Sequence, residues 1–180
     1  MIFVTVGAQM AFDRLVRTVD QWAGLRARSG VFAQIGPSDY LPKHIEAARF
    51  LDPVEFRTRV EAARVVVAHA GMGSIITALE LGKPIIVMPR RGDLRETRND
   101  HQVATAKHFA RQDRIVVAFD ERELLEKLDQ TETLCCSAPI SGVASPQLIA
   151  VLRAFLEGKS YTVDPVGSDD EAILDTGLSA

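Results

Sequence analysis

The stretch Val65-Val66-Val67-Ala68-His69-Ala70-Gly71-Met72-Gly73-Ser74 decides the fold of this chain. Its first four residues are apolar and three of them are β-branched, which predicts a strand buried on both faces of a parallel sheet. Its two glycines predict a tight turn, and a helix is expected from about Ser74 to Leu81, ended by Gly82 and Pro84. The stretch therefore reads as a strand, a glycine-containing turn and a helix.

The same alternation of strand and helix runs along most of the chain. The predicted strands are Ile2–Val6, Val31–Ile35, Arg49–Leu51, Val65–Ala68, Ile85–Met88 and Ile115–Ala118. The predicted helices are Phe12–Trp22, Pro53–Ala63, Ser74–Leu81, Asp100–Ala110, Glu121–Leu128 and Pro146–Leu156. This order predicts an α/β fold, a Rossmann-like parallel sheet with helices on both faces. Ligands of such sheets bind beyond the carboxyl ends of the strands, so the loops at those ends are the candidate sites.

Length and charge set further bounds. The 180 residues correspond to one domain, and a composition with 47% apolar and 25% charged residues is that of a globular protein. Five acidic residues and no Lys or Arg follow Ser160, which leaves 21 basic and 19 acidic side chains before it. We therefore predict a domain over residues 1–158 and an acidic, mobile tail over residues 159–180. The small positive charge of the domain excludes a nucleic-acid groove but allows one local anion site.

The cysteines and the apolar runs bear on the cell compartment. Cys135 and Cys136 are adjacent, a spacing that suits neither a disulfide nor a metal site. No other group of His, Cys or acidic residues has metal-ligand spacing. The N-terminus has no basic region, and no run reaches the roughly 20 apolar residues of a membrane helix. We therefore expect a soluble chain in a reducing cytoplasm, with no metal.

The turn Gly71-Met72-Gly73-Ser74 is the first candidate site. Glycines let the backbone approach a ligand, and the first N–H groups of a helix carry positive partial charge, which suits a phosphate. A strand-to-helix turn that binds nothing is the alternative. Two known phosphate motifs are excluded, because Ile76 replaces the third glycine of a dinucleotide fingerprint and Pro84 replaces the Ser or Thr of a P-loop.

The loop from Arg90 to Gln102 is the second candidate. It holds four arginines in nine positions, and arginine binds phosphate or carboxylate in a bidentate manner. Two acidic residues in the same loop favour a solvated role for most of these arginines. The polar run Asn99-Asp100-His101-Gln102 opens a helix at the same sheet edge, where short polar groups can contact sugar hydroxyls. Helix capping is the alternative for its first two residues, but it does not account for the last two.

Two further residues belong to the same edge. Gln9, in the turn Gly7-Ala8-Gln9 after the first strand, has an amide that can bind a ligand, although a simple turn explains it equally well. His69 ends a buried strand beside the glycine turn, where it could orient the turn or contact a phosphate. A buried histidine with satisfied hydrogen bonds is the alternative for His69.

Three motifs together are more specific than any one of them. Residues 65–74, Leu81-Gly82-Lys83-Pro84-Ile85-Ile86-Val87-Met88-Pro89 and Asn99-Asp100-His101-Gln102 resemble the glycosyltransferase family 28 C-terminal domain, the nucleotide-sugar half of a GT-B enzyme. The opening Val4-Thr5-Val6-Gly7 with Phe12-Asp13-Arg14-Leu15 is similar to the stand-alone members of that family. These are donor-binding subunits of bipartite transferases that build the dolichol-linked chitobiose core or bacterial exopolysaccharides. The resemblance covers residues 1–155.

The resemblance implies a role for each candidate residue. The glycine turn would hold the pyrophosphate of UDP, His101 and Gln102 would contact the donor sugar, and Gly7 and Gln9 would line the diphosphate side. Thr77 stands where family members carry a ribose-binding glutamate, with Glu80 nearly one turn later as the other candidate. The donor-binding residues so predicted are Gly7, Gln9, His69, Gly71, Met72, Gly73, Ser74, Thr77, Asn99, His101 and Gln102.

The resemblance also implies a partner. The chain offers no convincing general base beyond the weak candidate His69, and in the family the acceptor site and the base belong to the other half of the enzyme. We therefore expect a membrane-anchored acceptor-binding subunit, which brings a lipid-linked sugar acceptor and holds the chain at the cytoplasmic face of the membrane. The donor would be a UDP-sugar carrying a hexose, an N-acetylhexosamine or a hexuronic acid, without any cofactor.

Two other functions fit the same residues. One is a non-catalytic module with the same fold, which binds a nucleotide sugar or serves in interactions. It is supported by Thr77, which replaces the family's glutamate. A self-sufficient sugar-nucleotide enzyme such as an epimerase is the third interpretation. Enzymes of that kind usually place two domains around the cleft, for which this chain has no room.

Overall fold

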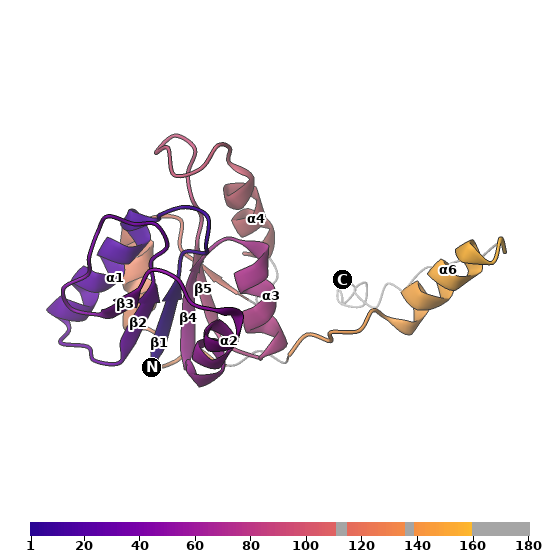
Figure 1. The fold of residues 1–180 in the computed structure, drawn as a ribbon, viewed down its shortest axis with the longest axis horizontal. Coiled ribbons are helices and arrows are strands. Elements are labelled where there is room, and N and C mark those ends of the chain that lie inside the picture. The colour runs from indigo at the N-terminus through magenta and orange to yellow at the C-terminus, as the bar shows by residue number, and fades with distance from the viewer. Residues whose placement is uncertain (111–114, 136–138, 160–180) are drawn as a thin grey trace, which may run out of the picture. The chain divides into compact units, whose positions relative to one another are not determined.

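A sheet of six parallel strands forms the centre of the unit Met1–Ile140 in the computed structural model, which describes residues 1–110, 115–135 and 139–159. Its strands are β1 (Ile2–Thr5), β2 (Val31–Gln34), β3 (Glu46–Ala48), β4 (Val65–His69), β5 (Ile85–Met88) and β6 (Val116–Val117). They lie in the order β3-β2-β1-β4-β5-β6 (Figure 1). From β1 the strands are added outward to β2 and β3 on one side and then, from β4 onward, on the other side, which confirms the predicted Rossmann-like sheet.

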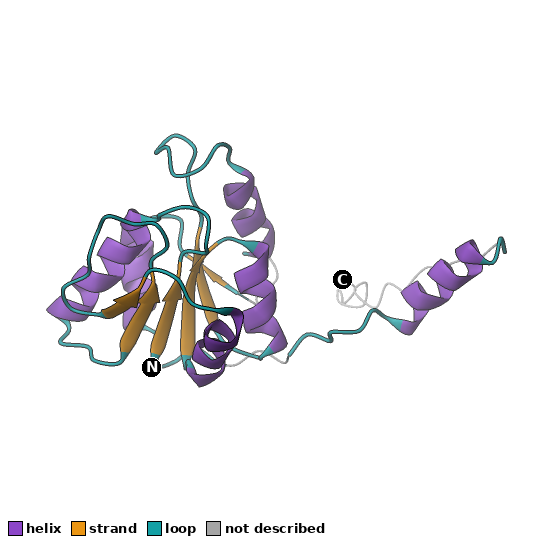
Figure 2. Ribbon diagram, in the orientation of Figure 1, coloured by secondary structure: helices purple, strands orange, loops and turns teal. Residues whose placement is uncertain are grey.

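Helices cover both faces of the sheet, as predicted (Figure 2). They are α1 (Asp13–Leu25), α2 (Pro53–Ala62), α3 (Met72–Glu80), α4 (His101–Phe109) and α5 (Glu121–Asp129). The helices α1 and α5 supply Trp22 and Leu124 to the core on one face. The helices α2, α3 and α4 supply Val60, Ile75 and Ala106 to the core on the other face.

The central position of β4 explains why its sequence is apolar on both sides. It pairs with β1 along one edge and with β5 along the other. Val65 and Val67 pack into the core beneath α1 and α5, while Val66 and Ala68 pack into the opposite core. All four side chains are at most 1% exposed, so the predicted burial on two faces is confirmed. The loop that follows β4 therefore starts from a strand that is buried on both faces.

The third strand differs from the prediction. The strand β3 covers Glu46–Ala48, whereas Arg49–Leu51 was expected on the strength of its apolar residues. The backbone N–H groups of Ile35 and Gly36 donate to the carbonyls of Ala48 and Arg49 at 2.9 and 2.8 Å, so the hydrogen bonding beside β2 reaches only the first residue of the predicted range. Because β3 is an edge strand with mostly exposed side chains, it needs few apolar residues, and Leu51 reaches the core only after the strand has ended. The other predicted elements are present, with ends shifted by a few residues.

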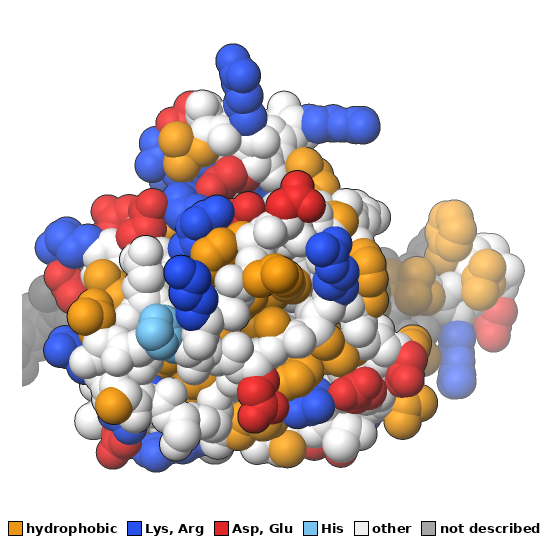
Figure 3. Space-filling view, turned by 60° about the vertical axis from the view of Figure 1, so that its left-hand side comes forward, with side chains coloured by type: hydrophobic (Ala, Val, Ile, Leu, Met, Phe, Trp, Pro, Cys, Tyr) orange, Lys and Arg blue, Asp and Glu red, His pale blue; other side chains and the backbone are white. Residues whose placement is uncertain are grey.

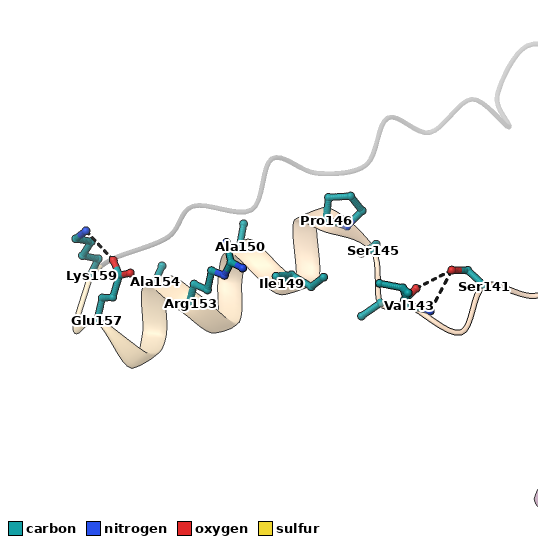
Figure 4. Close-up of a pocket in the computed structure, with 11 residues that line it drawn as sticks. Ser141, Val143, Ser145, Pro146, Ile149, Ala150, Arg153, Ala154, Glu157 and Lys159 are labelled. Atoms are coloured by element: carbon teal, nitrogen blue, oxygen red, sulfur yellow. Dashed lines mark hydrogen bonds and ion pairs between the residues drawn. The ribbon is translucent and has the colours of Figure 1, made fainter.

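The chain from Ser141 onward forms a second unit, which contains the predicted helix α6 (Pro146–Leu156). The hydroxyl of Ser145 accepts a hydrogen bond from the backbone N–H of Leu148 at 3.2 Å and caps this helix. A hollow of about 1000 Å³ lies beside α6, but it contains none of the predicted site residues (Figure 4). Residues 160–180, nearly all of the predicted tail, lie outside the described residues, so the domain boundary after residue 158 stays a prediction. No helix within the described ranges combines the length and the apolar character needed to span a bilayer.

Two adjacent leucines of α5 offer a matched test of the core. Leu124 is fully buried and Leu125 is 36% exposed. Leu124→Ala leaves a cavity beneath the sheet and is expected to lower the free energy of unfolding by about 3 kcal/mol, whereas Leu125→Ala should cost under about 1 kcal/mol. Urea unfolding followed by circular dichroism measures both. Equal losses for the two variants would contradict the placement of α5 on the sheet.

Candidate functional site

A cavity of about 440 Å³ opens at the carboxyl edge of the sheet, where the strand order reverses between β1 and β4. Three loops contribute to it: one after β1, one between β4 and α3, and one between β5 and α4. Its lining consists of Val6, Gly7, Ala8, Gln9, Met10, His69, Gly73, Ser74, Arg90, Thr97, His101 and Gln102. The position is the one at which doubly wound sheets bind their ligands.

Most of the predicted site residues meet in this cavity. Gly7, Gln9, His69, Gly73, Ser74, His101 and Gln102 all line it. The other four, Gly71, Met72, Thr77 and Asn99, lie in the same loops and helices but outside the lining. Segments more than 60 residues apart in the sequence are thus brought to one place by the pairing of β1, β4 and β5.

The imidazole of His69 fills the space between two of the glycines. A Cβ atom at Gly71 would lie 2.1 Å from Nε2 of His69, and a Cβ atom at Gly7 would lie 2.8 Å from its Cε1. Gly7 also has φ of +76°, a conformation that L side chains rarely adopt. Both positions therefore require glycine because of His69. Gly71 acts in this structure through that packing, since it does not line the cavity itself.

The same burial sets the charge of His69. Its pKa is lowered from 6.5 to about 4, first because burial disfavours the imidazolium and second because the Arg90 guanidinium repels it, with the backbone of Thr5 acting in the opposite sense. Its Nδ1 atom is buried and has no hydrogen-bond partner among the described residues. His69 is therefore a neutral imidazole near neutral pH. A pKa of about 4 makes it a weak proton acceptor, which is unfavourable for a general base.

The first turn of α3 presents backbone N–H groups at the cavity. The helix begins at Met72 after Gly71, whose carbonyl accepts from the N–H of Ile75 at 3.2 Å, so the preceding N–H groups have no acceptor within the helix. An added Cβ at Gly73 would have no heavy atom within 4 Å, so the space in front of this turn is open. The hydroxyl of Thr77 donates to the carbonyl of Gly73 at 2.9 Å and is directed along the helix.

The polar run at the start of α4 has three separate roles. The buried amide of Gln102 accepts a hydrogen bond from the backbone N–H of Arg90 at 3.2 Å, which ties the helix to the end of β5. Nδ1 of His101 contacts the Oδ1 atom of Asn99, so Asn99 orients the histidine from outside the cavity. Asp100 makes no capping bond to α4, contrary to the alternative raised above. Its carboxylate accepts from the N–H of Gly92 at 2.7 Å and closes the preceding loop.

Arg90 lines the cavity, although it was not among the predicted site residues. Its side chain is only 3% exposed, although the composition of its loop favours solvated arginines. That description does hold for Arg95 and Arg98, which are exposed. Lys and Arg side chains project from the upper end of the molecule in Figure 3, the end at which this loop lies in Figure 1. The sequence held one indication that Arg90 is buried: it comes two residues after a buried strand.

Among the described residues, no group of three or more His, Cys, Asp or Glu side chains could hold a metal ion. The cysteine that the structure describes, Cys135, is exposed and unpaired, and Cys136 lies outside the described residues. The cavity chemistry thus consists of backbone N–H groups, one hydroxyl of Ser and one of Thr, amides, imidazoles and one guanidinium. Such a set suits a polar, anionic ligand.

The fold and the cavity define a Rossmann-like domain with its ligand site at the topological switch point. The chain belongs to the glycosyltransferase family 28 C-terminal domain, which matches residues 1–138. The resemblance stated from the sequence motifs is therefore confirmed. The three loops of the cavity all fall within the matched region.

Individual relatives agree with this assignment. The chain is 30% identical over 118 residues to the human UDP-N-acetylglucosamine transferase subunit ALG13, a match that covers 60% of this chain and 10% of the human protein. The chain thus spans only a small part of that relative. The solution structure of ALG13 has a TM-score of 0.53 at 18% identity and covers 84% of this chain and 93% of that one. The crystal structure of the glycotransferase of kitacinnamycin has a TM-score of 0.56 at 19% identity. The match covers 74% of this chain and 35% of that one. These two structures share the fold.

The buried imidazole makes stability depend on pH. The pKa of His69 is about 4 in the folded protein and about 6.5 when exposed, so only the unfolded chain takes up this proton between those values. The contribution of His69 to stability is complete above pH 6.5 and falls by about 3 kcal/mol as the pH drops to about 4. Titration of the His69 ring protons by NMR measures the pKa directly. A value at or above 6.5 would contradict the burial described for this ring.

Proposed function

We propose that this chain is the donor-binding subunit of a bipartite glycosyltransferase that uses a UDP-sugar. One observation carries the proposal: the open first turn of α3, with Gly73 and Ser74, faces the same cavity as His101 and Gln102. A helix start of this kind binds phosphate through its N–H groups and its positive dipole. The polar start of α4 lies within reach of a sugar attached to that phosphate.

Different residues of the cavity bind different parts of the donor. The diphosphate lies on the first turn of α3, with the hydroxyl of Ser74 as a further donor, and Gly7 and Gln9 border it from the β1 side. His101 and Gln102 contact the hexose, N-acetylhexosamine or hexuronic acid. In the transfer step an acceptor hydroxyl oxygen forms a bond to C1 of the sugar, and the bond from C1 to the diphosphate oxygen breaks with its electron pair leaving on UDP. The helix start stabilises that developing negative charge without a metal or other cofactor.

The hydroxyl proton of the acceptor has no good receiver in this cavity. His69 is the buried base closest to the glycine turn, and its low pKa makes it weak. We therefore place the base and the acceptor site on a second, membrane-anchored subunit that carries a lipid-linked sugar. The word "subunit" in the name of human ALG13 supports this arrangement. The chain itself then lies in the cytoplasm, at the membrane surface, through that partner.

A second function is supported by one residue. The hydroxyl of Thr77 is engaged with the carbonyl of Gly73 and lies outside the cavity lining, so it does not replace the ribose-binding glutamate expected from the family. Glu80 is exposed at the end of α3. A module that binds a nucleotide sugar without transferring it would tolerate this change. Transfer activity is what separates the two functions.

The proposal is tested in two stages. Calorimetric titration of the whole chain with UDP and with UDP-N-acetylglucosamine measures donor binding. Addition of a radiolabelled UDP-sugar to the chain and membranes of the organism that encodes it then measures transfer to lipid. Binding followed by transfer supports the donor subunit, and binding without transfer supports the non-transferring module. Absence of binding, both alone and with the membranes, would overturn both.

Gly73 gives a direct probe of the phosphate position. Gly73→Asp places a carboxylate in open space at the helix start, where it repels a diphosphate, so we expect UDP affinity to fall at least about 100-fold. Gly73→Asn is the control of equal size without charge, and its affinity should fall by less than about tenfold. Both variants should fold, because an added Cβ has no heavy atom within 4 Å. If Gly73→Asp binds UDP as tightly as Gly73→Asn, the phosphate lies elsewhere.

A further inference from the structure

The charge of the donor cavity comes from a single side chain. Among its lining residues, all of which lie in the described part of the chain, Arg90 is the sole Lys or Arg, and none is Asp or Glu. The neighbouring His69 is neutral, because its pKa lies at about 4. The sign of the field inside this cavity is therefore set by Arg90.

The guanidinium of Arg90 is held by carbonyl oxygens. Its Nη2 donates to the carbonyls of Val6 at 2.8 Å and Met10 at 2.7 Å, and its Nη1 donates to the carbonyls of Ala11 and Glu96. None of these acceptors carries a formal charge. The hydrogen bonds fix the position of the guanidinium but leave its positive charge unneutralised.

The acid nearest to Arg90 is occupied by another arginine. The carboxylate of Glu96 accepts from Nε of Arg14 at 2.7 Å and from its Nη2 at 2.8 Å, and it also accepts from the backbone N–H of Arg91 at 2.9 Å. Arg14 and Glu96 thus form a bidentate pair of nearly zero net charge. This pair fastens the loop and does not neutralise Arg90.

The energetic state of Arg90 is that of a cation without a counterion. Burial lowers the pKa of Arg90 to about 10, and the electrostatic attraction of Glu96 acts against that shift. The residue is still fully protonated near neutral pH. A buried cation of this kind is stabilised when an anion enters the site, which gives the empty cavity a preference for negatively charged ligands.

We propose that Arg90 is the residue that selects and holds the diphosphate of the nucleotide, by placing one unpaired positive charge in the donor cavity. The inference rests on the proposed function for the identity of the ligand. The alternative is that Arg90 acts only as a structural latch, meaning that its hydrogen bonds hold the loops after β1 and β5 together and its charge plays no part in binding. A latch would affect every ligand of the cavity equally, whereas a charge acts on phosphate.

Titration of UDP and of uridine, at low ionic strength and near neutral pH, separates these roles. Arg90→Gln removes the charge and keeps some hydrogen bonding. Arg90→Lys keeps the charge and loses the planar set of guanidinium N–H donors. The double variant Arg14→Gln/Glu96→Gln loosens the same loop from outside the cavity and removes one positive and one negative charge, so the net charge is unchanged. Arg91→Gln is the control for loss of charge alone, because its guanidinium is exposed, pairs with Asp93 at 2.6 Å and does not line the cavity.

The expected result is a change in selectivity. Arg90→Gln should lower the affinity for UDP at least about tenfold, while the affinity for uridine changes by less than about threefold. Arg90→Lys should retain most of the preference for UDP. Arg14→Gln/Glu96→Gln should lower the affinities for UDP and for uridine by the same factor, and Arg91→Gln should leave both affinities unchanged. Equal weakening of UDP and uridine by Arg90→Gln would reduce Arg90 to a latch. Failure of the unaltered chain to bind UDP at all would instead contradict the proposed function.

Arg90→Gln leaves several buried carbonyls without a donor, so its thermal unfolding must be measured first. Should that variant not fold, the comparison of Arg90→Lys with Arg14→Gln/Glu96→Gln decides between a role of the charge and a purely structural role. The unaltered chain gives a further test, because the charge requires UDP to bind at least about tenfold more tightly than uridine and to lose that advantage as salt is added. Equal affinities, or a preference that salt does not alter, would overturn the inference without any variant.

Discussion

The packing of one imidazole between two glycines is the constraint on which the cavity depends. The strands β1 and β4 are neighbours, with Thr5 in register with Ala68, so the chain after each strand leaves the sheet at the same level. His69 then fills the gap, and any side chain at Gly7 or Gly71 would collide with it. The spacing of the two loops is therefore set by the width of a ring. This contact also fixes the position of the first turn of α3, which begins directly after Gly71.

A second set of contacts brings in the third loop. Arg14, at the start of α1, reaches the carboxylate of Glu96 and also the carbonyl of Pro89 at 3.1 Å. Gln102 binds the backbone of Arg90 from the other side. These bonds connect α1, the loop after β5 and α4, so the polar start of α4 faces the glycine turn of α3 across the cavity. Long-range polar bonds thus complete a site that hydrophobic packing of the sheet only begins.

The sequence predicts those features that local pattern controls. The buried strand at residues 65–69 and the glycine turn after it follow from apolar runs and helix-stop residues, and the loop that carries His101 follows from strand order. The edge strand β3 was misplaced, because exposed residues carry no apolar pattern. The burial of Arg90 could not be predicted, because three of its four carbonyl acceptors lie 79 to 84 residues away and become neighbours only in the folded sheet. The packing of Gly71 against His69 is likewise visible only in three dimensions.

The wide separation of the cavity residues along the chain has a thermodynamic consequence. The loops at Gly7, Gly73 and His101 meet only when the central strands are paired, so no fragment of the unit can offer the complete site. A ligand of this cavity thus binds the folded state alone, and its binding energy adds to the stability of the whole sheet through mass action. Slowed amide exchange in β1, β4 and β5 would accompany occupancy of the site. The concentration of that ligand in the cell would then also govern what fraction of the chain stays folded.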